Sequence, residues 1–137
     1  RNNLNCVLYI HIDGLEQLTD LYGLAVVEGL LHREGEKVSA SVRASDVVSR
    51  YGEDNFVVIL QDIQAPENVE HVGKRLLKIL GRELSEHSEK GISLSVRAGA
   101  SLFPDESSRD PVSIMKKAEK ALNNAAPADG VPISISA

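Results

Sequence analysis

The distribution of apolar residues along the chain predicts five strands. Residues 5–12 (NCVLYIHI) form a nearly continuous apolar run, which is typical of a central strand covered on both faces. Residues 46–51 and 55–60 are two strand-like runs joined by a short polar turn, as in a hairpin. From residue 92 to 102 the apolar positions alternate strictly, which predicts a half-buried strand. Residues 131–136 (VPISIS) are expected to form a closing strand.

Four further segments have the periodicity of amphipathic helices. Residues 15–22 follow Asp13, which is expected to cap that helix, and Gly23 separates them from a second helix over 24–42. A third helix begins near Pro66. A fourth is expected to bury a stripe consisting of Val112, Met115, Ala118, Leu122 and Ala125. The order β-α-α-β-β-α-β-α-β favours the α/β (α+β) class, with a single sheet flanked by helices.

Length, charge and cysteine content narrow the possible functions. The 137 residues fit one domain, and Cys6 is the only cysteine, so neither an internal disulfide nor a thiolate zinc cluster can form. The net charge of -5 argues against a nucleic-acid partner or membrane contact, because either would require a basic face. No apolar stretch reaches the roughly 20 residues that span a bilayer. We expect a cytoplasmic location. Because the chain opens on Arg1, we also expect a piece excised from a longer multidomain protein.

Four motifs in this order resemble the GGDEF family, the diguanylate cyclase domain that joins two GTP molecules into cyclic di-GMP. They are IHIDGLEQLTDLYG at 10–23, RASDVVSRYGEDNF at 43–56, SVRAGASLFPD at 95–105 and MKKAEKALNNA at 115–125. The resemblance implies a single domain over 1–137, with a central, mostly antiparallel five-stranded sheet flanked by helices. Such a fold is cyclase-like and related to polymerase palm domains.

The catalytic positions implied by this resemblance are degenerate. Cyclases of the family place a metal carboxylate where His11 stands, and imidazole is a poor ligand for magnesium. The hairpin motif reads Gly52-Glu53-Asp54-Asn55-Phe56, so Glu53 replaces a glycine that lets phosphates approach, and Asn55 replaces a glutamate. Asp13, two residues after His11 in the family's D-x-D pattern, stays acidic, and Asp54 matches the acidic metal position of the hairpin. We therefore expect no catalytic residues, and only vestigial metal positions at His11 and Asp54.

The nucleotide contacts implied by the resemblance are also altered. Thr19 and Glu28 occupy the positions that would read guanine, and Glu28 at least keeps a carboxylate. Glu16 and Ala126 stand where lysines would neutralise the triphosphate. We expect no active cyclase and no cofactor, with magnesium required only if the domain is a cyclase after all.

One family site is retained. Many members carry an R-x-x-D motif before the hairpin, which binds the cyclic dinucleotide product, and here it reads Arg43-Ala44-Ser45-Asp46. Arginine can fork onto N7 and O6 of guanine, and a carboxylate can accept from N1 and N2. A further cation comes from the next helix, where Lys74 and Arg75 lie, and we assign Arg75. The alternative is structural: Asp46 would cap a turn and Arg43 would complement a helix C-terminus.

These observations predict a catalytically inactive regulatory or sensory domain in cyclic di-GMP signalling. Its expected partners are cyclic di-GMP and a neighbouring EAL or sensor domain in the same chain. A weakly active cyclase using Asp13, Glu28 and Asp54 is the alternative. A third hypothesis is a GTP-binding module without turnover, which the loss of the phosphate cations disfavours.

Overall fold

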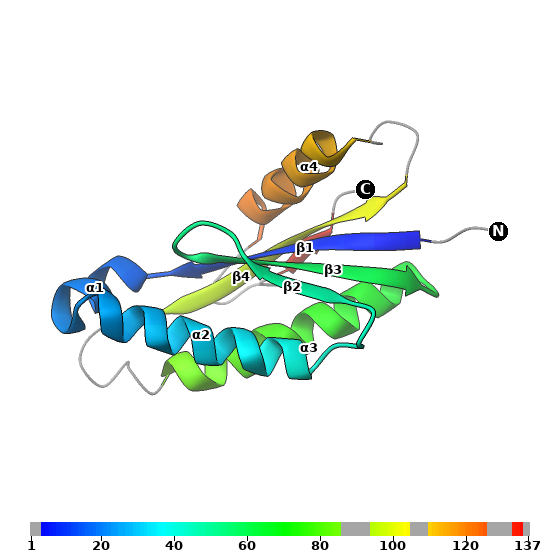
Figure 1. Ribbon diagram of the computed structural model, residues 1–137. Coiled ribbons are helices and arrows are strands. Elements are labelled where there is room, and N and C mark those ends of the chain that lie inside the picture. The colour runs from blue at the N-terminus through cyan, green and yellow to red at the C-terminus, as the bar shows by residue number, and fades with distance from the viewer. Residues whose placement is uncertain (1–3, 86–93, 105–109, 126–132, 136–137) are drawn as a thin grey trace.

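The computed structural model describes residues 4–85, 94–104, 110–125 and 133–135 of the chain. Within them, the helices and strands follow the order that the sequence predicts (Figure 1). They are β1 (Leu4–Asp13), α1 (Leu15–Tyr22), α2 (Leu24–Ala40), β2 (Val47–Arg50), β3 (Asn55–Ile63), α3 (Pro66–Ser85), β4 (Ser95–Phe103), α4 (Pro111–Asn123) and β5 (Ile133–Ile135).

The strands form one sheet in the order β2-β3-β1-β4-β5. Strand β1 is antiparallel to both of its neighbours, β2 is antiparallel to β3, and only β5 runs parallel to its neighbour β4. The expected mostly antiparallel five-stranded sheet is therefore confirmed. Residues Cys6 to Ile10 are all buried, which explains why the central strand is apolar at successive positions.

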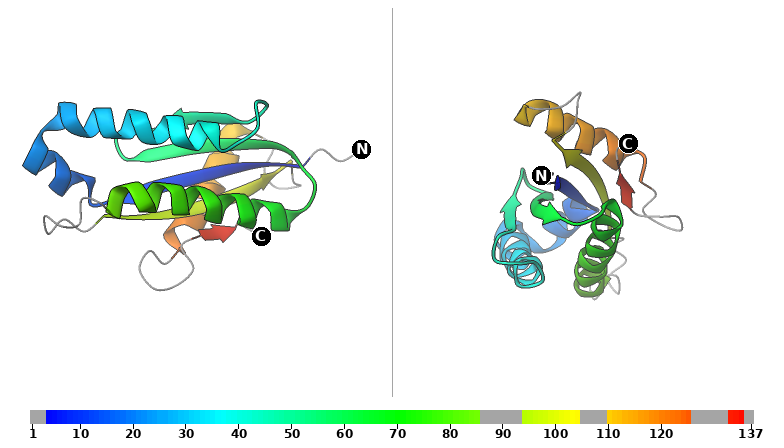
Figure 2. Two further views of the ribbon diagram at one scale, coloured as in Figure 1. Left: turned by 90° about the horizontal axis from the view of Figure 1, so that it is seen from below. Right: turned by 90° about the vertical axis from the view of Figure 1, so that its right-hand side faces the viewer.

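Helices cover both faces of the sheet. Figure 2 shows α2 and α3 on one side and α4 on the other. The larger apolar core lies beneath α2 and α3, where Cys6, Leu8 and Ile10 of β1 meet Leu31 and Leu76. A smaller core lies beneath α4 on the opposite face. No helix in the part of the chain that the structure describes is both long and apolar enough to cross a membrane.

Strand β4 corrects the expectation of a half-buried strand. Ala98, Gly99, Ala100 and Ser101 are all buried, so both faces are covered in the middle of this strand. The reason is the approach of α4, whose backbone at Ala118 and Leu122 lies directly over Gly99. Only a residue without a side chain leaves room for that contact. Residues 92 and 93, at the start of the predicted strand, lie outside the described residues.

Two predictions about helices are wrong. Asp13 does not cap α1, because it is the last residue of β1, and Gly14 precedes the helix with a φ of 99° and no side-chain hydrogen bond. Val112 is not part of the buried stripe of α4: it is 62% exposed, and Ile114 is buried instead. Asp110 caps this helix by accepting a hydrogen bond from the Ser113 backbone, which sets the rotation of its first turn.

The contact between α4 and Gly99 makes a testable prediction. Gly99→Ala places a methyl group against the backbone of Ala118 and Leu122 and should lower the free energy of unfolding by about 2 kcal/mol or more, measured by urea denaturation. Gly81→Ala in α3 is the control, because a Cβ at this position meets nothing within 4 Å. It should raise stability by about 0.5 to 1 kcal/mol through helix propensity. Equal effects of the two changes would contradict the close packing of α4.

Candidate functional site

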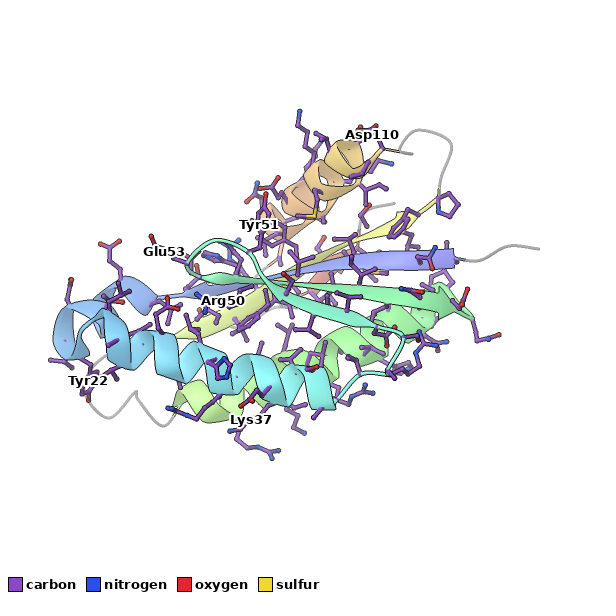
Figure 3. The ribbon with its side chains drawn as sticks, viewed as in Figure 1. Tyr22, Lys37, Arg50, Tyr51, Glu53 and Asp110 are labelled. Atoms are coloured by element: carbon purple, nitrogen blue, oxygen red, sulfur yellow. The ribbon has the colours of Figure 1, made fainter. Side chains whose placement is uncertain are left out.

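The motif Gly52-Glu53-Asp54-Asn55-Phe56 spans the turn between β2 and β3, at the carboxyl end of β1. Gly52 adopts a φ of 74°, and the backbone N–H of Tyr51 donates to the carbonyl of Asn55 across the turn. The N–H of Ile12 donates to the carbonyl of Asp54, which attaches the turn to β1. Phe56 is buried in the core, and Glu53 is exposed. Figure 3 labels Glu53 at the tip of the turn.

His11 and Asp54, which the sequence analysis predicts to be vestigial metal positions, lie close together beside this turn. His11 Nδ1 is 2.8 Å from Asn55 Oδ1 and 4.0 Å from Asp54 Oδ2. The amide nitrogen of Asn55 donates to Asp54 Oδ1 at 3.1 Å. His11, Asp54 and Asn55 are therefore in contact with one another beside the turn.

Asp13 is also engaged. Its Oδ1 lies 3.1 Å from His11 Nε2, and its Oδ2 accepts from Arg97 Nε at 3.1 Å. Arg97 in turn donates to the carbonyl of Leu122 at the end of α4. Among the residues with described positions, no group of three His, Cys, Asp or Glu side chains is arranged to hold a metal ion.

The positions expected to contact the nucleotide line a cavity of about 160 Å³ between α1, α2 and the hairpin turn. Thr19 donates its hydroxyl to the carbonyl of Leu15, and both oxygens of Glu28 lie 3.3 Å from the guanidinium of Arg50. The carboxylates around this cavity belong to Glu16, Asp20, Glu28, Glu53 and Asp54, and its described lining includes no lysine or arginine. Ala126, the other position at which a lysine was expected, lies outside the described residues. A triphosphate would meet a like charge here.

The R-x-x-D residues line a different and larger cavity, of about 390 Å³, at the open end of the same hairpin. Arg43 and Asp46 precede β2, and Arg75 reaches the cavity from α3. The fold therefore brings Arg75 to the same cavity as Arg43 and Asp46, which precede it in the sequence by about 30 residues. Lys74 points elsewhere: its Nζ pairs with Glu70 at 2.9 Å.

Asp46 is the structural centre of this second cavity. Its carboxylate accepts from the Arg43 guanidinium at 3.0 and 3.1 Å, and from the backbone N–H groups of Arg43 and Gln61 at 2.9 and 3.0 Å. The Asp46 side chain is only 3% exposed, and Arg43 also donates to the carbonyl of Gln61. Burial opposes ionisation, but the hydrogen bonds outweigh it and hold the pKa of Asp46 below its usual value.

Arg75 is held by the end of α2, where its guanidinium donates to the carbonyl of Ser41 at 2.7 Å. His71 and Asn68 of α3 also line the cavity, and the sequence reasoning did not select them. His71 precedes Arg75 by four residues, so the helical period alone places both on one face of α3 and could have identified it.

Curated proteins with similar sequences carry names connected with cyclic di-GMP. The chain is 29% identical over 100 residues to the bifunctional diguanylate cyclase/cyclic di-GMP phosphodiesterase MucR of Pseudomonas aeruginosa, which covers 72% of this chain and 14% of MucR. It is also 29% identical over 118 residues to diguanylate cyclase A of Treponema denticola, covering 85% of this chain and 31% of that protein. The chain thus spans less than a third of the length of these relatives.

Solved structures share the fold. An EAL/GGDEF domain protein from M. capsulatus superposes with a TM-score of 0.80 at 20% identity, covering 99% of this chain and 86% of that one. The GGDEF domain of TpbB from Pseudomonas aeruginosa gives 0.79 at 21% identity, covering 98% and 83%. The GGDEF domain of DgcB from Caulobacter crescentus, in complex with c-di-GMP, gives 0.75 at 16% identity, covering 98% and 78%.

The family itself follows from a match along the sequence. A sequence profile described as "Diguanylate cyclase, GGDEF domain" matches residues 1–130, which includes the hairpin turn, both cavities and all four helices. With the sheet order and the hairpin at the end of β1 as the structure shows them, this chain belongs to the GGDEF domain family.

Proposed function

We propose that this GGDEF domain is a regulatory module that binds cyclic di-GMP in the cavity around Arg43, Asp46 and Arg75, and that it does not synthesise the dinucleotide. One observation carries the proposal. The two cavities of the hairpin differ in charge: two arginines and two aspartates line the one at its open end, whereas the one at its turn is lined by five carboxylates and, among the described residues, by no lysine or arginine.

The cavity at the open end offers the groups that recognise guanine. An arginine fork matches O6 and N7 of the base, and a buried carboxylate matches its N1 and N2 donors. In the unliganded domain, Arg43 and Asp46 satisfy each other, so a guanine must replace their mutual hydrogen bonds with its own. Arg75 lies at the same cavity and supplies a cation for the phosphates.

The geometry at the hairpin turn argues against catalysis. Phosphodiester formation from GTP requires a divalent cation and groups that neutralise the triphosphate. His11, Asp13 and Asp54 have protein partners instead. The weakly active cyclase would use Asp13, Asp54 and Glu28, yet Asp13 is paired with Arg97 and Glu28 with Arg50. A GTP-binding module would meet the same carboxylates, so no observation favours either alternative.

The domain is proposed to act within a longer, cytoplasmic protein next to an EAL or sensor domain. The relatives support this arrangement, since MucR is named as both a cyclase and a phosphodiesterase and the M. capsulatus protein as EAL/GGDEF. Cyclic di-GMP bound in the cavity would contact both the loop before β2 and α3. It would thereby change how this domain restrains the neighbouring EAL or sensor domain.

Replacing Arg43 tests the proposed ligand. Isothermal titration calorimetry should detect binding of cyclic di-GMP to the unchanged domain, and Arg43→Ala should weaken it about 10- to 100-fold by removing the guanine fork. Arg33→Ala, which removes an exposed arginine of α2 outside the cavity, is the matched control and should leave the affinity unchanged. If the unchanged domain fails to bind cyclic di-GMP at millimolar concentration, the proposal is wrong.

Asp46 makes a prediction about pH and stability. Because its pKa is lower in the folded protein, ionised Asp46 stabilises the fold above the unfolded pKa of about 3.9, and this contribution is lost as the pH falls through the folded value. Asp46→Asn should therefore lower the free energy of unfolding by about 1 to 2 kcal/mol at neutral pH. The difference between the two proteins should shrink below about pH 4. Urea denaturation at several pH values measures it, and a difference independent of pH would refute the assigned role of the carboxylate.

The absence of synthesis is tested with GTP and either Mg²⁺ or Mn²⁺. Chromatography should detect no cyclic di-GMP above a protein-free control, for both the unchanged domain and Asp54→Ala. Product from the unchanged domain that disappears in Asp54→Ala would establish the weak cyclase and overturn this part of the proposal.

A further inference from the structure

Exposed apolar side chains gather where α1 meets α2. Four of the seven large apolar residues that are exposed in the described part of the chain lie in this short segment: Leu21, Tyr22, Leu24 and Val26. Leu24 is 60% exposed, and Leu21 is 55% exposed. The two helices already supply Leu15, Leu18 and Val27 to the core, so the fold itself does not require the exposed residues to be apolar. Figure 3 shows Tyr22 at this end of the molecule.

The same corner is strongly acidic. Residues 15–31 contain three carboxylates, from Glu16, Asp20 and Glu28, and no lysine or arginine, although Arg50 of β2 pairs with Glu28. Asp20 lies in the last turn of α1, where the helix dipole is negative and where the helix has no basic residue. Its charge therefore disfavours the isolated helix. The hairpin turn adds Glu53 and Asp54 beside the same small cavity. We call the exposed Leu21 and Leu24, together with these carboxylates, the α1–α2 corner.

We propose that the α1–α2 corner is the docking surface for a basic amphipathic helix of a protein partner. Such a helix carries apolar side chains for Leu21 and Leu24, and lysines or arginines for the surrounding carboxylates. The cavity beside Leu24 is lined by Leu15 and Val27 as well as by acids. It can receive the aliphatic stem of a lysine or arginine while the charged end reaches Glu16 or Asp20.

Charge complementarity selects this occupant among the alternatives. An anionic lipid surface or a nucleic acid would be repelled by the carboxylates. A second copy of this chain would bring a protein of net charge -5 against the corner, and a symmetric contact would place the same acids opposite one another. This inference goes beyond the proposed binding of cyclic di-GMP, because it concerns the other end of the hairpin and does not depend on that ligand.

The test uses a synthetic helical peptide of lysine and leucine residues in amphipathic order, titrated into the whole domain with fluorescence anisotropy as the readout. Leu24→Ser should weaken binding about tenfold, because a buried leucine contact is lost. Val112→Ser in α4 is the matched control, since Val112 is exposed to a similar extent (62%, against 60% for Leu24) but lies in another helix, and it should leave the affinity unchanged.

A second variant separates binding from folding. Asp20→Asn should weaken peptide binding about two- to fivefold, as expected for loss of one exposed ion pair. It should also leave the melting temperature equal or slightly higher, because a negative charge is removed from the negative end of α1. Glu119→Gln, in α4, is the control for charge and should not change the affinity.

Three results would overturn the proposal. The first is the absence of binding by the amphipathic peptide to the unchanged domain. The second is equal binding of an oligolysine of the same charge, which would show attraction to a polycation without an apolar contact. The third is equal loss of affinity in Leu24→Ser and Val112→Ser. Preferential binding of the amphipathic peptide, with losses confined to Leu24→Ser and Asp20→Asn, would support it.

Discussion

Both cavities depend on the position of β1 in the middle of the sheet. This strand forms hydrogen bonds with β3 on one edge and β4 on the other, and apolar side chains cover both of its faces. Its register with β3 determines which residues of β1 lie beside each end of the hairpin. His11 is therefore fixed opposite Asn55 at the turn, while Leu4 is opposite Ile63 at the open end. A buried strand cannot slip by one residue without exchanging its two faces, so this constraint places both candidate sites.

The two ends of the hairpin differ in the partners of their charged groups. At the turn, the side chain of Asn55 contacts both His11 and Asp54. Arg97 binds Asp13 and the carbonyl of Leu122, which connects this end of β1 with α4. At the open end, Asp46 joins the loop after α2 to the end of β3 through the backbone of Gln61. In the first arrangement, the polar side chains are paired with one another. The second leaves a charged cavity between two helices and the hairpin, where an incoming ligand can exchange hydrogen bonds with Arg43.

Much of the candidate site was predictable because the relevant residues lie within local motifs. The spacing of Arg43 and Asp46, and the departures at His11, Glu53 and Asn55, are visible in the sequence. The sequence did not reveal that Glu28 is paired with Arg50, because these residues are 22 positions apart and meet only when α2 packs beside β2. It also placed Asp13 at a helix cap, whereas Arg97 from β4 holds its side chain in the sheet.

The sequence by itself determined the order of the elements, the apolar character of β1 and the hairpin, since these follow from hydrophobic period and turn residues. Only the tertiary structure decided which faces are covered and which charges are neutralised. The alternation in β4 indicated one buried face, but the approach of α4 to Gly99 buries both. Likewise, the carboxylates of α1, α2 and the hairpin turn lie around one cavity only because these three elements meet in the fold. The hydrophobic periodicity of a segment reflects only the helix or strand that it forms. Packing between elements depends instead on contacts between residues that are distant in the sequence.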